Sequence, residues 1–184
     1  MRTWSTTRSA STRRGRRRRS PRVRLENSGN SCSVDGAMFE VYFDSAAMAK
    51  AEGHFRQAAA KRMEAIGFFL GSVHSWKGEK FVRATDYVTA ENDSTSVSVR
   101  FATGAFPRLA ERITGKGLIV AWAHSHPGFG AFMSETDVRT HESCFDGEYN
   151  YALVIDPVRG EKKVFKVDGG EVREASFAVV EKRK

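Results

Sequence analysis

A nearly unbroken apolar segment that turns abruptly polar constrains this chain more than any other feature. Residues 118–126 read LIVAWAHSH, and Pro127 follows directly. Apolar residues on both alternating faces are typical of a central strand that is buried within a sheet. Because side chains alternate along a strand, His124 and His126 project from the same face, and both imidazoles can reach one ion. The segment therefore predicts a central strand that ends in two potential metal ligands.

The residues after this strand bring a carboxylate back toward the two histidines. The glycines of the segment PGFG permit a sharp turn, and Ser134 is a natural N-cap for a helix whose first turn carries Asp137. Two His and one Asp make a three-ligand site, and a zinc ion with three protein ligands keeps its fourth position for water. The spacing therefore predicts a catalytic rather than a structural metal site at His124, His126 and Asp137.

A hydrolase of this kind also needs a group that moves a proton, and Glu64 is the candidate. It stands between an Ala-rich helical run and an apolar stretch, in the pattern E-x-x-G-x-x-x-G. A carboxylate at such a site takes a proton from water and returns it to the leaving amine. A glutamate at a helix end is, taken alone, more often a solvated surface residue. The glycine pattern around Glu64 favours the catalytic interpretation.

Together these motifs resemble those of the JAMM, or MPN-plus, family of zinc isopeptidases, over residues 39–167. The run HSHPGFG followed by S-x-x-D-V-x-T most resembles the deubiquitinating subunit of the proteasome lid and its archaeal relatives. The resemblance implies that His124, His126 and Asp137 hold one Zn²⁺. It also implies that Glu64 acts as general base and then general acid, and that Ser134 donates a hydrogen bond to the oxyanion.

The resemblance further implies a substrate and its partners. The bond hydrolysed would follow the C-terminal Gly-Gly of ubiquitin or a ubiquitin-like protein, either in a conjugate to lysine or in a precursor. The extended tail of that protein would add as a strand beside residues 88–97, where the candidate contacts are Val88, Asn92, Ser96 and Val97. The proteasome, or another MPN subunit, is a further expected partner.

Two other functions stay open at this stage. One is a non-catalytic MPN scaffold, although the complete set of ligands argues against it. The other is a JAMM peptidase that acts on sulfur-carrier or small-metabolite conjugates. Among the remaining candidate residues, His54 and His74 are expected to be ordinary side chains, while His141 lies one helical turn after Asp137 and is expected to support the site rather than bind the metal. Asp156 is expected in a turn.

All of the excess positive charge lies in the first 24 residues. They hold ten Arg, no Lys and no acidic residue, whereas the rest of the chain carries 20 basic and 22 acidic residues. Arg, Ser and Thr with few apolar residues cannot bury enough surface to offset chain entropy, so residues 1–33 are predicted to form a disordered basic tail. Such a tail would bind nucleic acid only non-specifically and in a salt-sensitive way. An organelle transit peptide and a dedicated nucleic-acid arm are alternatives.

The remaining residues, 34–184, have the usual size of one domain with one core. The whole chain has two cysteines and no C-x-x-C motif, which argues against a disulfide framework and against a second zinc site. The missing motif also excludes the zinc nucleobase deaminases, which need it for two of their metal ligands. No apolar run approaches the roughly 20 residues that cross a bilayer. We expect a cytoplasmic protein without a membrane partner, with organelle targeting by the tail left open.

Hydrophobic periodicity predicts an α/β domain with a mixed, largely antiparallel sheet. The resemblance implies that this sheet is curved and flanked by helices, as in cytidine deaminases. Residues 65–76 and 80–90 are expected to form a hairpin through the Lys77-Gly78 turn. Helices are expected at 45–63 with Asp44 as cap, at 106–114 and at 135–145, and further strands at 38–43, 96–101, 117–126, 149–157, 161–170 and 172–182.

Overall fold

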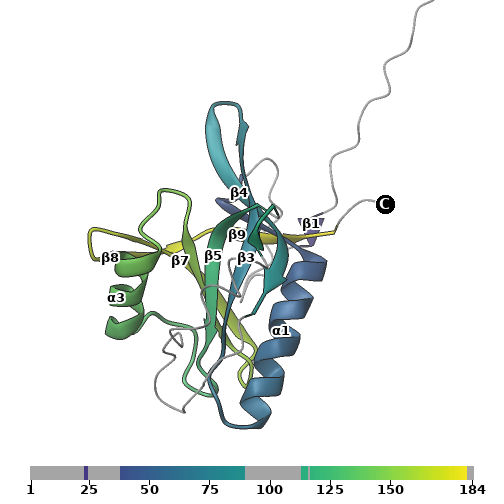
Figure 1. Cartoon of the computed structure of the whole chain (residues 1–184), viewed down its shortest axis with the longest axis vertical. Coiled ribbons are helices and arrows are strands. Elements are labelled where there is room, and N and C mark those ends of the chain that lie inside the picture. Colours follow the sequence, from purple (N-terminus) through teal and green to yellow (C-terminus); the bar gives the residue numbers. More distant parts are fainter. Residues whose placement is uncertain (1–22, 25–37, 90–112, 116, 182–184) are drawn as a thin grey trace, which may run out of the picture.

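A single nine-stranded sheet organises the part of the chain that the computed structural model describes, residues 23–24, 38–89, 113–115 and 117–181. The strand order is β1-β9-β2-β4-β3-β5-β6-β7-β8. The strands are β1 Val23–Arg24, β2 Val41–Asp44, β3 Ile66–Trp76, β4 Glu79–Val88, β5 Leu118–Ser125, β6 Tyr151–Asp156, β7 Glu161–Asp168, β8 Glu171–Ala175 and β9 Phe177–Val180. Helices α1, Ser45–Ala60, and α3, Glu135–Cys144, flank this curled sheet (Figure 1).

The sheet is mixed and largely antiparallel, as predicted. β2 runs parallel to β4 and β9, and β5 runs parallel to β6, whereas the other neighbouring strands are antiparallel. Parallel neighbours need a crossover connection, and the connection from β5 to β6 contains α3. His124 at the end of β5 and Asp137 in α3 therefore belong to one β5–α3–β6 unit.

Each face of the sheet has its own hydrophobic core. Side chains alternate along the strands, so Phe69 and Ala121 lie in the core covered by α1, while Phe68 and Trp122 lie in the other. On the first face, α1 contributes four buried residues, Ala47, Met48, Ala51 and Phe55. On the second face, Phe145 at the end of α3 packs against Trp122. His124 follows Trp122 by two residues and therefore lies on the face of α3.

The β3–β4 hairpin forms as predicted and projects from the body of the sheet (Figure 1). Lys77 and Gly78 both have positive φ, 52° and 88°, which matches the twist that a tight two-residue hairpin requires. The glycines of the pattern after Glu64 have packing roles. A Cβ on Gly67 would lie 2.1 Å from the Tyr87 hydroxyl, and one on Gly71 would lie 1.9 Å from the Arg83 carbonyl oxygen.

Several predicted boundaries were wrong, for identifiable reasons. The first helix ends at Ala60 rather than at residue 63, and Arg62 adopts a positive φ of 57°. Asp44 holds the N-cap position but makes no side-chain cap; its carboxylate instead accepts a hydrogen bond from Arg83 Nε at 2.8 Å. The strand predicted at 172–182 is two strands, because β8 pairs with β7 and β9 pairs with β2.

The predicted basic tail and two predicted elements fall mainly outside the described residues. The strand at 96–101 lies there entirely, as does the helix at 106–114 up to residue 112. Of the tail, Val23–Arg24 are described, and they pair with β9 as the short strand β1, so these two residues depart from the predicted disorder. The domain boundary at residue 34 stays a prediction.

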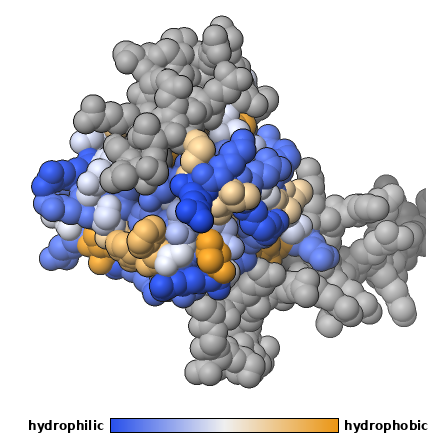
Figure 2. Space-filling model, turned by 90° about the horizontal axis from the view of Figure 1, so that it is seen from below, coloured by the Kyte–Doolittle hydropathy of each residue, from blue (hydrophilic) through white to orange (hydrophobic). Residues whose placement is uncertain are grey.

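No helix in the described part of the chain is long and apolar enough to span a membrane. Figure 2 shows one face of the molecule, on which hydrophilic residues dominate the described surface and apolar residues gather in small groups between them.

Candidate metal centre

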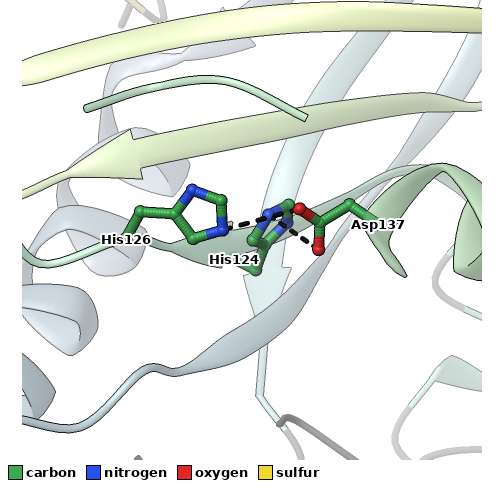
Figure 3. A group of neighbouring side chains, drawn as sticks. All are labelled: His124, His126 and Asp137. Atoms are coloured by element: carbon green, nitrogen blue, oxygen red, sulfur yellow. Dashed lines mark ion pairs between the residues drawn. The ribbon is translucent and has the colours of Figure 1, made fainter. Parts of the chain in front are cut away.

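Two histidines and one aspartate meet where β5 ends and α3 begins. His124 lies in β5, His126 follows that strand directly, and Asp137 lies in the first turn of α3. Figure 3 shows the two imidazoles and the carboxylate pointing toward one another. The Nε2 atom of His124 lies 3.3 Å from Asp137 Oδ1, and that of His126 lies 3.5 Å from Asp137 Oδ2. One potential ligand atom from each residue falls within 4.8 Å of the others.

Ser134 orients the carboxylate of Asp137 through the helix cap that the sequence predicts. The Ser134 hydroxyl donates to Asp137 Oδ2 at 2.6 Å, and the Ser134 backbone N–H donates to the same oxygen at 2.8 Å. The Asp137 backbone N–H in turn donates to Ser134 Oγ at 3.3 Å, which completes a reciprocal capping box. Helix formation at this position therefore aims Asp137 at the histidines.

The buried nitrogens of the two histidines fit a metal ion. Among the described residues, both ring nitrogens of His124 and the Nδ1 of His126 have no hydrogen-bond partner. Buried polar atoms without partners are uncommon because their desolvation is not compensated. Two imidazole nitrogens and one carboxylate oxygen form a donor set that zinc prefers, with three protein ligands. Of the sequence-predicted site residues, these three are brought together as expected.

The charges of the site are strongly coupled. Burial raises the pKa of Asp137, but the nearby imidazoles of His124 and His126 and the hydrogen bond from the Ser134 hydroxyl outweigh burial and hold that pKa well below its usual range. Burial lowers the pKa of His126, yet the carboxylate of Asp137 more than compensates and leaves it raised. The pKa of Glu64 is raised, mainly by burial. Glu64 also interacts electrostatically with all three residues, so it belongs to the same cluster of charges.

An open cleft of about 240 Å³ contains the cluster. Glu64 reaches it from the segment between α1 and β3, and Ser134 reaches it from the start of α3. Phe129 and Phe132 form part of its rim, with exposed fractions of 72% and 46%. The cleft therefore presents the predicted acid–base group, the hydroxyl and the potential ligands to one bound molecule.

A stack of aromatic rings packs against the imidazole of His124. The Trp122 ring stacks on the His124 ring with centroids 4.6 Å apart, and on Phe145 at 5.5 Å. His141 is buried, and its Nδ1 accepts a hydrogen bond from Trp122 Nε1 at 3.0 Å. Burial lowers the pKa of His141 to about 4, so it is neutral at pH 7. His141 thus binds Trp122, which stacks on the potential ligand His124, rather than the Asp137 carboxylate.

One residue near the site escaped the sequence analysis. Asp156 was expected in a turn, and it does accept hydrogen bonds from the turn after β6, but it also binds the glycine-rich loop after His126. Its signal in the sequence is a charged residue at the end of a wholly apolar strand, YALVID. Only the parallel pairing of β5 with β6 shows that this residue lies beside the loop.

The expected substrate-binding segment is largely outside the described residues. Val88, at the end of β4, is buried. Asn92, Ser96 and Val97 lie outside the described ranges.

Comparison with known proteins identifies the family. A family model described as prokaryotic homologs of the JAB domain matches residues 46–167. The chain belongs to the JAMM/MPN family as a JAB-domain protein. A solved structure, that of protein DSY2949 from Desulfitobacterium hafniense, has the same fold, with a TM-score of 0.59 and 22% identity; the match covers 77% of this chain and 94% of that one.

Curated relatives of this JAB domain include proteasome subunits. It is 34% identical over 134 residues to the 26S proteasome regulatory subunit RPN11 of Candida glabrata, covering 70% of this chain and 42% of that protein. It is 31% identical over 133 residues to the ubiquitin carboxyl-terminal hydrolase RPN11 of Saccharomyces cerevisiae, with the same coverage. A shorter match is to the NAD(+) hydrolase TcpA of a Theionarchaea archaeon, with 44% identity over 64 residues. It covers 34% of this chain and 20% of that protein. The chain spans less than half the length of these relatives.

Proposed function

We propose that this JAB domain is a zinc-dependent peptidase that hydrolyses the bond after the C-terminal Gly-Gly of ubiquitin or a ubiquitin-like protein. The observation that carries the proposal is the gathering of His124, His126, Asp137, Glu64 and Ser134 at one cleft. The family and the names of the proteasome relatives support the choice of substrate class. The complete residue set favours an enzyme over a scaffold that has lost its ligands.

In this proposal His124, His126 and Asp137 hold the metal. A zinc ion in this position acts as a Lewis acid, which lowers the pKa of water and polarises a substrate carbonyl. Glu64 takes the proton from the attacking water and returns it to the leaving amine, a role that suits a carboxylate whose pKa is raised by burial. No side chain of the cleft acts as a nucleophile in this scheme.

Ser134 and the start of α3 stabilise negative charge on the substrate carbonyl oxygen. The Ser134 hydroxyl lines the cleft, and its single proton, which it donates to Asp137 in the free protein, can turn to the substrate oxygen when substrate is bound. The N-terminus of a helix adds a favourable dipole for an anion at this position. Two separate features of one helix cap would therefore act on the same oxygen.

The substrate enters as an extended chain. The rim residues Phe129 and Phe132 leave the cleft open enough for a narrow backbone that ends in Gly-Gly, because glycine adds no side chain beside the rings. A strand formed by the substrate tail beside the segment after β4, which includes the candidate contacts Asn92, Ser96 and Val97, would supply main-chain hydrogen bonds. The partners are then a ubiquitin-like protein, its conjugates and, in the cell, a proteasome or another MPN subunit.

The test is cleavage of defined substrates by the zinc-loaded full chain. A ubiquitin-like precursor with residues after Gly-Gly and a lysine-linked conjugate of the same protein are incubated with the protein, with and without a chelator. We expect cleavage after Gly-Gly that the chelator abolishes. A protein that binds zinc but cleaves neither substrate would refute the proposal and favour the scaffold. Cleavage of a sulfur-carrier or small-metabolite conjugate alone would move the activity to that substrate class.

A further inference from the structure

A buried carboxylate lies beside the metal centre in a role that the proposed chemistry does not use. Asp156 is the last residue of β6, and its exposed fraction is 0%. Its Oδ1 accepts hydrogen bonds from the backbone N–H groups of Gly128 at 2.9 Å, Val158 at 2.9 Å and Arg159 at 3.1 Å. Its Oδ2 accepts one from the N–H of Gly130 at 2.7 Å. One carboxylate therefore binds four backbone amides.

These amides belong to two different segments. Gly128 and Gly130 lie in the loop after β5, whereas Val158 and Arg159 lie in the turn between β6 and β7. β5 and β6 run parallel, so their carboxyl ends meet at the same edge of the sheet. Glu161 extends the connection, since its Oε2 accepts a hydrogen bond from the Ala131 N–H at 3.3 Å. The loop is thus fastened to the β6–β7 turn by acidic side chains.

Asp156 is suited to this task as an anion. Burial raises its pKa, but the N–H groups of Gly128, Gly130, Arg159 and Val158 outweigh burial and leave the pKa lowered. The Arg159 Nε, 3.7 Å from Oδ2, adds a positive charge nearby. An ionised carboxylate only accepts hydrogen bonds, so both of its oxygens match the surrounding donors. A carboxamide in the same place would turn an N–H group toward another N–H group.

The loop that Asp156 anchors begins directly after His126, and backbone hydrogen bonds hold His126 on both sides. The His126 N–H donates to the Ile155 carbonyl at 3.0 Å, and the Phe129 N–H donates to the His126 carbonyl at 3.2 Å. Gly128 and Gly130 have φ values of 87° and 92°, a conformation that glycine adopts freely but does not enforce. The shape of the loop therefore needs an external anchor.

We propose that Asp156 is a positioning residue that holds the loop 127–130 in place and thereby aims His126 at the metal centre. Asp156 is not among the residues that line the cleft. Its effect passes through the backbone of Gly128 and Gly130. The inference deepens the proposed function by adding a residue to the support of the site. Zinc affinity tests the positioning role of Asp156 without any substrate. The positioning role can therefore fail while the proposed peptidase activity stands, and the peptidase activity can fail while the positioning role stands.

The test compares zinc affinity in full-length variants. Asp156→Asn keeps the size of the side chain and replaces one acceptor by a donor. Loss of an outer partner of a ligand typically weakens metal binding by about 10- to 100-fold, and we expect a loss of that size in competition with a chromophoric chelator. The visible absorption of the Co²⁺-loaded variant should also differ from that of the wild type, because it reports the geometry of the ligands.

Asp44→Asn is the matched control. Asp44 is also a buried carboxylate and is paired with Arg83. It lies at the end of β2, which β4 and β3 separate from the ligand-bearing strand β5. This variant should lose stability yet keep the zinc affinity and the Co²⁺ spectrum of the wild type. Wild-type zinc affinity in Asp156→Asn, or an equal loss in both variants, would overturn the proposal.

A second pair of variants covers the case in which Asp156→Asn does not fold. Gly128 and Gly78 both have positive φ, 87° and 88°, and a Cβ on either would meet no atom within 4 Å. Alanine at either position therefore introduces backbone strain alone. Gly128→Ala strains the loop that holds His126 and should weaken zinc binding, whereas Gly78→Ala strains the β3–β4 hairpin turn and should not. Equal zinc affinities in the two variants would refute the positioning role.

Discussion

Glu64 depends on its surroundings more than any other residue of the site. It is half-buried at the end of a segment without regular structure, and burial is the main reason that its pKa is raised. The two histidines lower that pKa and Asp137 raises it. A group whose pKa is shifted toward neutrality can both accept and return a proton at physiological pH. This balance suggests a direct test of Glu64.

Replacing Glu64 with Gln should remove activity while preserving the fold. The amide keeps the shape of the side chain but cannot take a proton, so we expect a loss of at least about 100-fold in kcat. Zinc content and thermal stability should stay close to those of the wild type. Glu79→Gln, on the exposed hairpin, is the control and should be fully active. Wild-type turnover in Glu64→Gln would remove Glu64 from the mechanism.

The three potential ligands can be tested by metal content alone. His124→Ala, His126→Ala and Asp137→Asn should each reduce bound zinc, because each removes one of three donors. His74→Ala is the control, since His74 is exposed and hydrogen-bonded to Ser72 on β3. Elemental analysis after dialysis measures the stoichiometry. Full occupancy in all three ligand variants would show that the metal, if any, binds elsewhere.

At the scale of elements, the strongest patterns predicted the structure well. The hairpin of β3 and β4, the central strand β5 and the helix α3 follow from alternation, a turn dipeptide and a capping residue, all of which act over a few neighbouring residues. The gathering of the ligands followed from the same local signals. The division into β8 and β9 and the role of Asp156 did not, because both depend on which distant strand becomes a neighbour.

The cap of α3 joins helix stability to catalysis. Ser134→Ala removes the hydroxyl that accepts from the Asp137 N–H and donates to the Asp137 carboxylate, and loss of such a cap costs about 1 kcal/mol. We expect a lower thermal midpoint together with a lower kcat. Ser143→Ala, which removes an exposed hydroxyl bonded within the same helix, should change neither kcat nor zinc affinity. Unchanged kcat in Ser134→Ala would exclude the hydroxyl from the chemistry.

The β6–β7 turn should make part of the stability pH-dependent. The pKa of Asp156 is lower in the folded protein than its ordinary value of 3.8. Its contribution is therefore fully present above about pH 4 and is lost as the pH falls through the lowered pKa. The wild type should exceed Asp156→Asn in urea midpoint at neutral pH, and the difference should shrink in acid. A difference that stays constant down to acid pH would show that the ionised form of Asp156 is not what stabilises the turn.

At the scale of the whole molecule, the basic N-terminal residues and the metal centre should be separable. The ten arginines precede Leu25, whereas the site lies on β5 and α3, several strands away from β1 in the sheet. A chain that begins at Ser33 loses β1 from the edge of the sheet and should still bind zinc and cleave substrate. Its affinity for DNA or RNA should disappear, while that of the full chain should fall steeply with salt. Cleavage rates and polyanion binding are measured for both chains; loss of turnover on truncation would mean that β1 supports the domain.

The parallel pairing of β5 with β6 also bears on how sequences of this kind can vary in length. The eight steps from His126 to Ser134 connect two ligand-bearing elements at one edge of the sheet, and two acidic side chains fasten them on the way. Residues 146–150 complete the same crossover at the opposite end of α3, and none of them lines the cleft. Insertions should therefore be tolerated between α3 and β6 but should disrupt the metal centre between β5 and α3. Natural differences in length are expected to concentrate in the segment between α3 and β6.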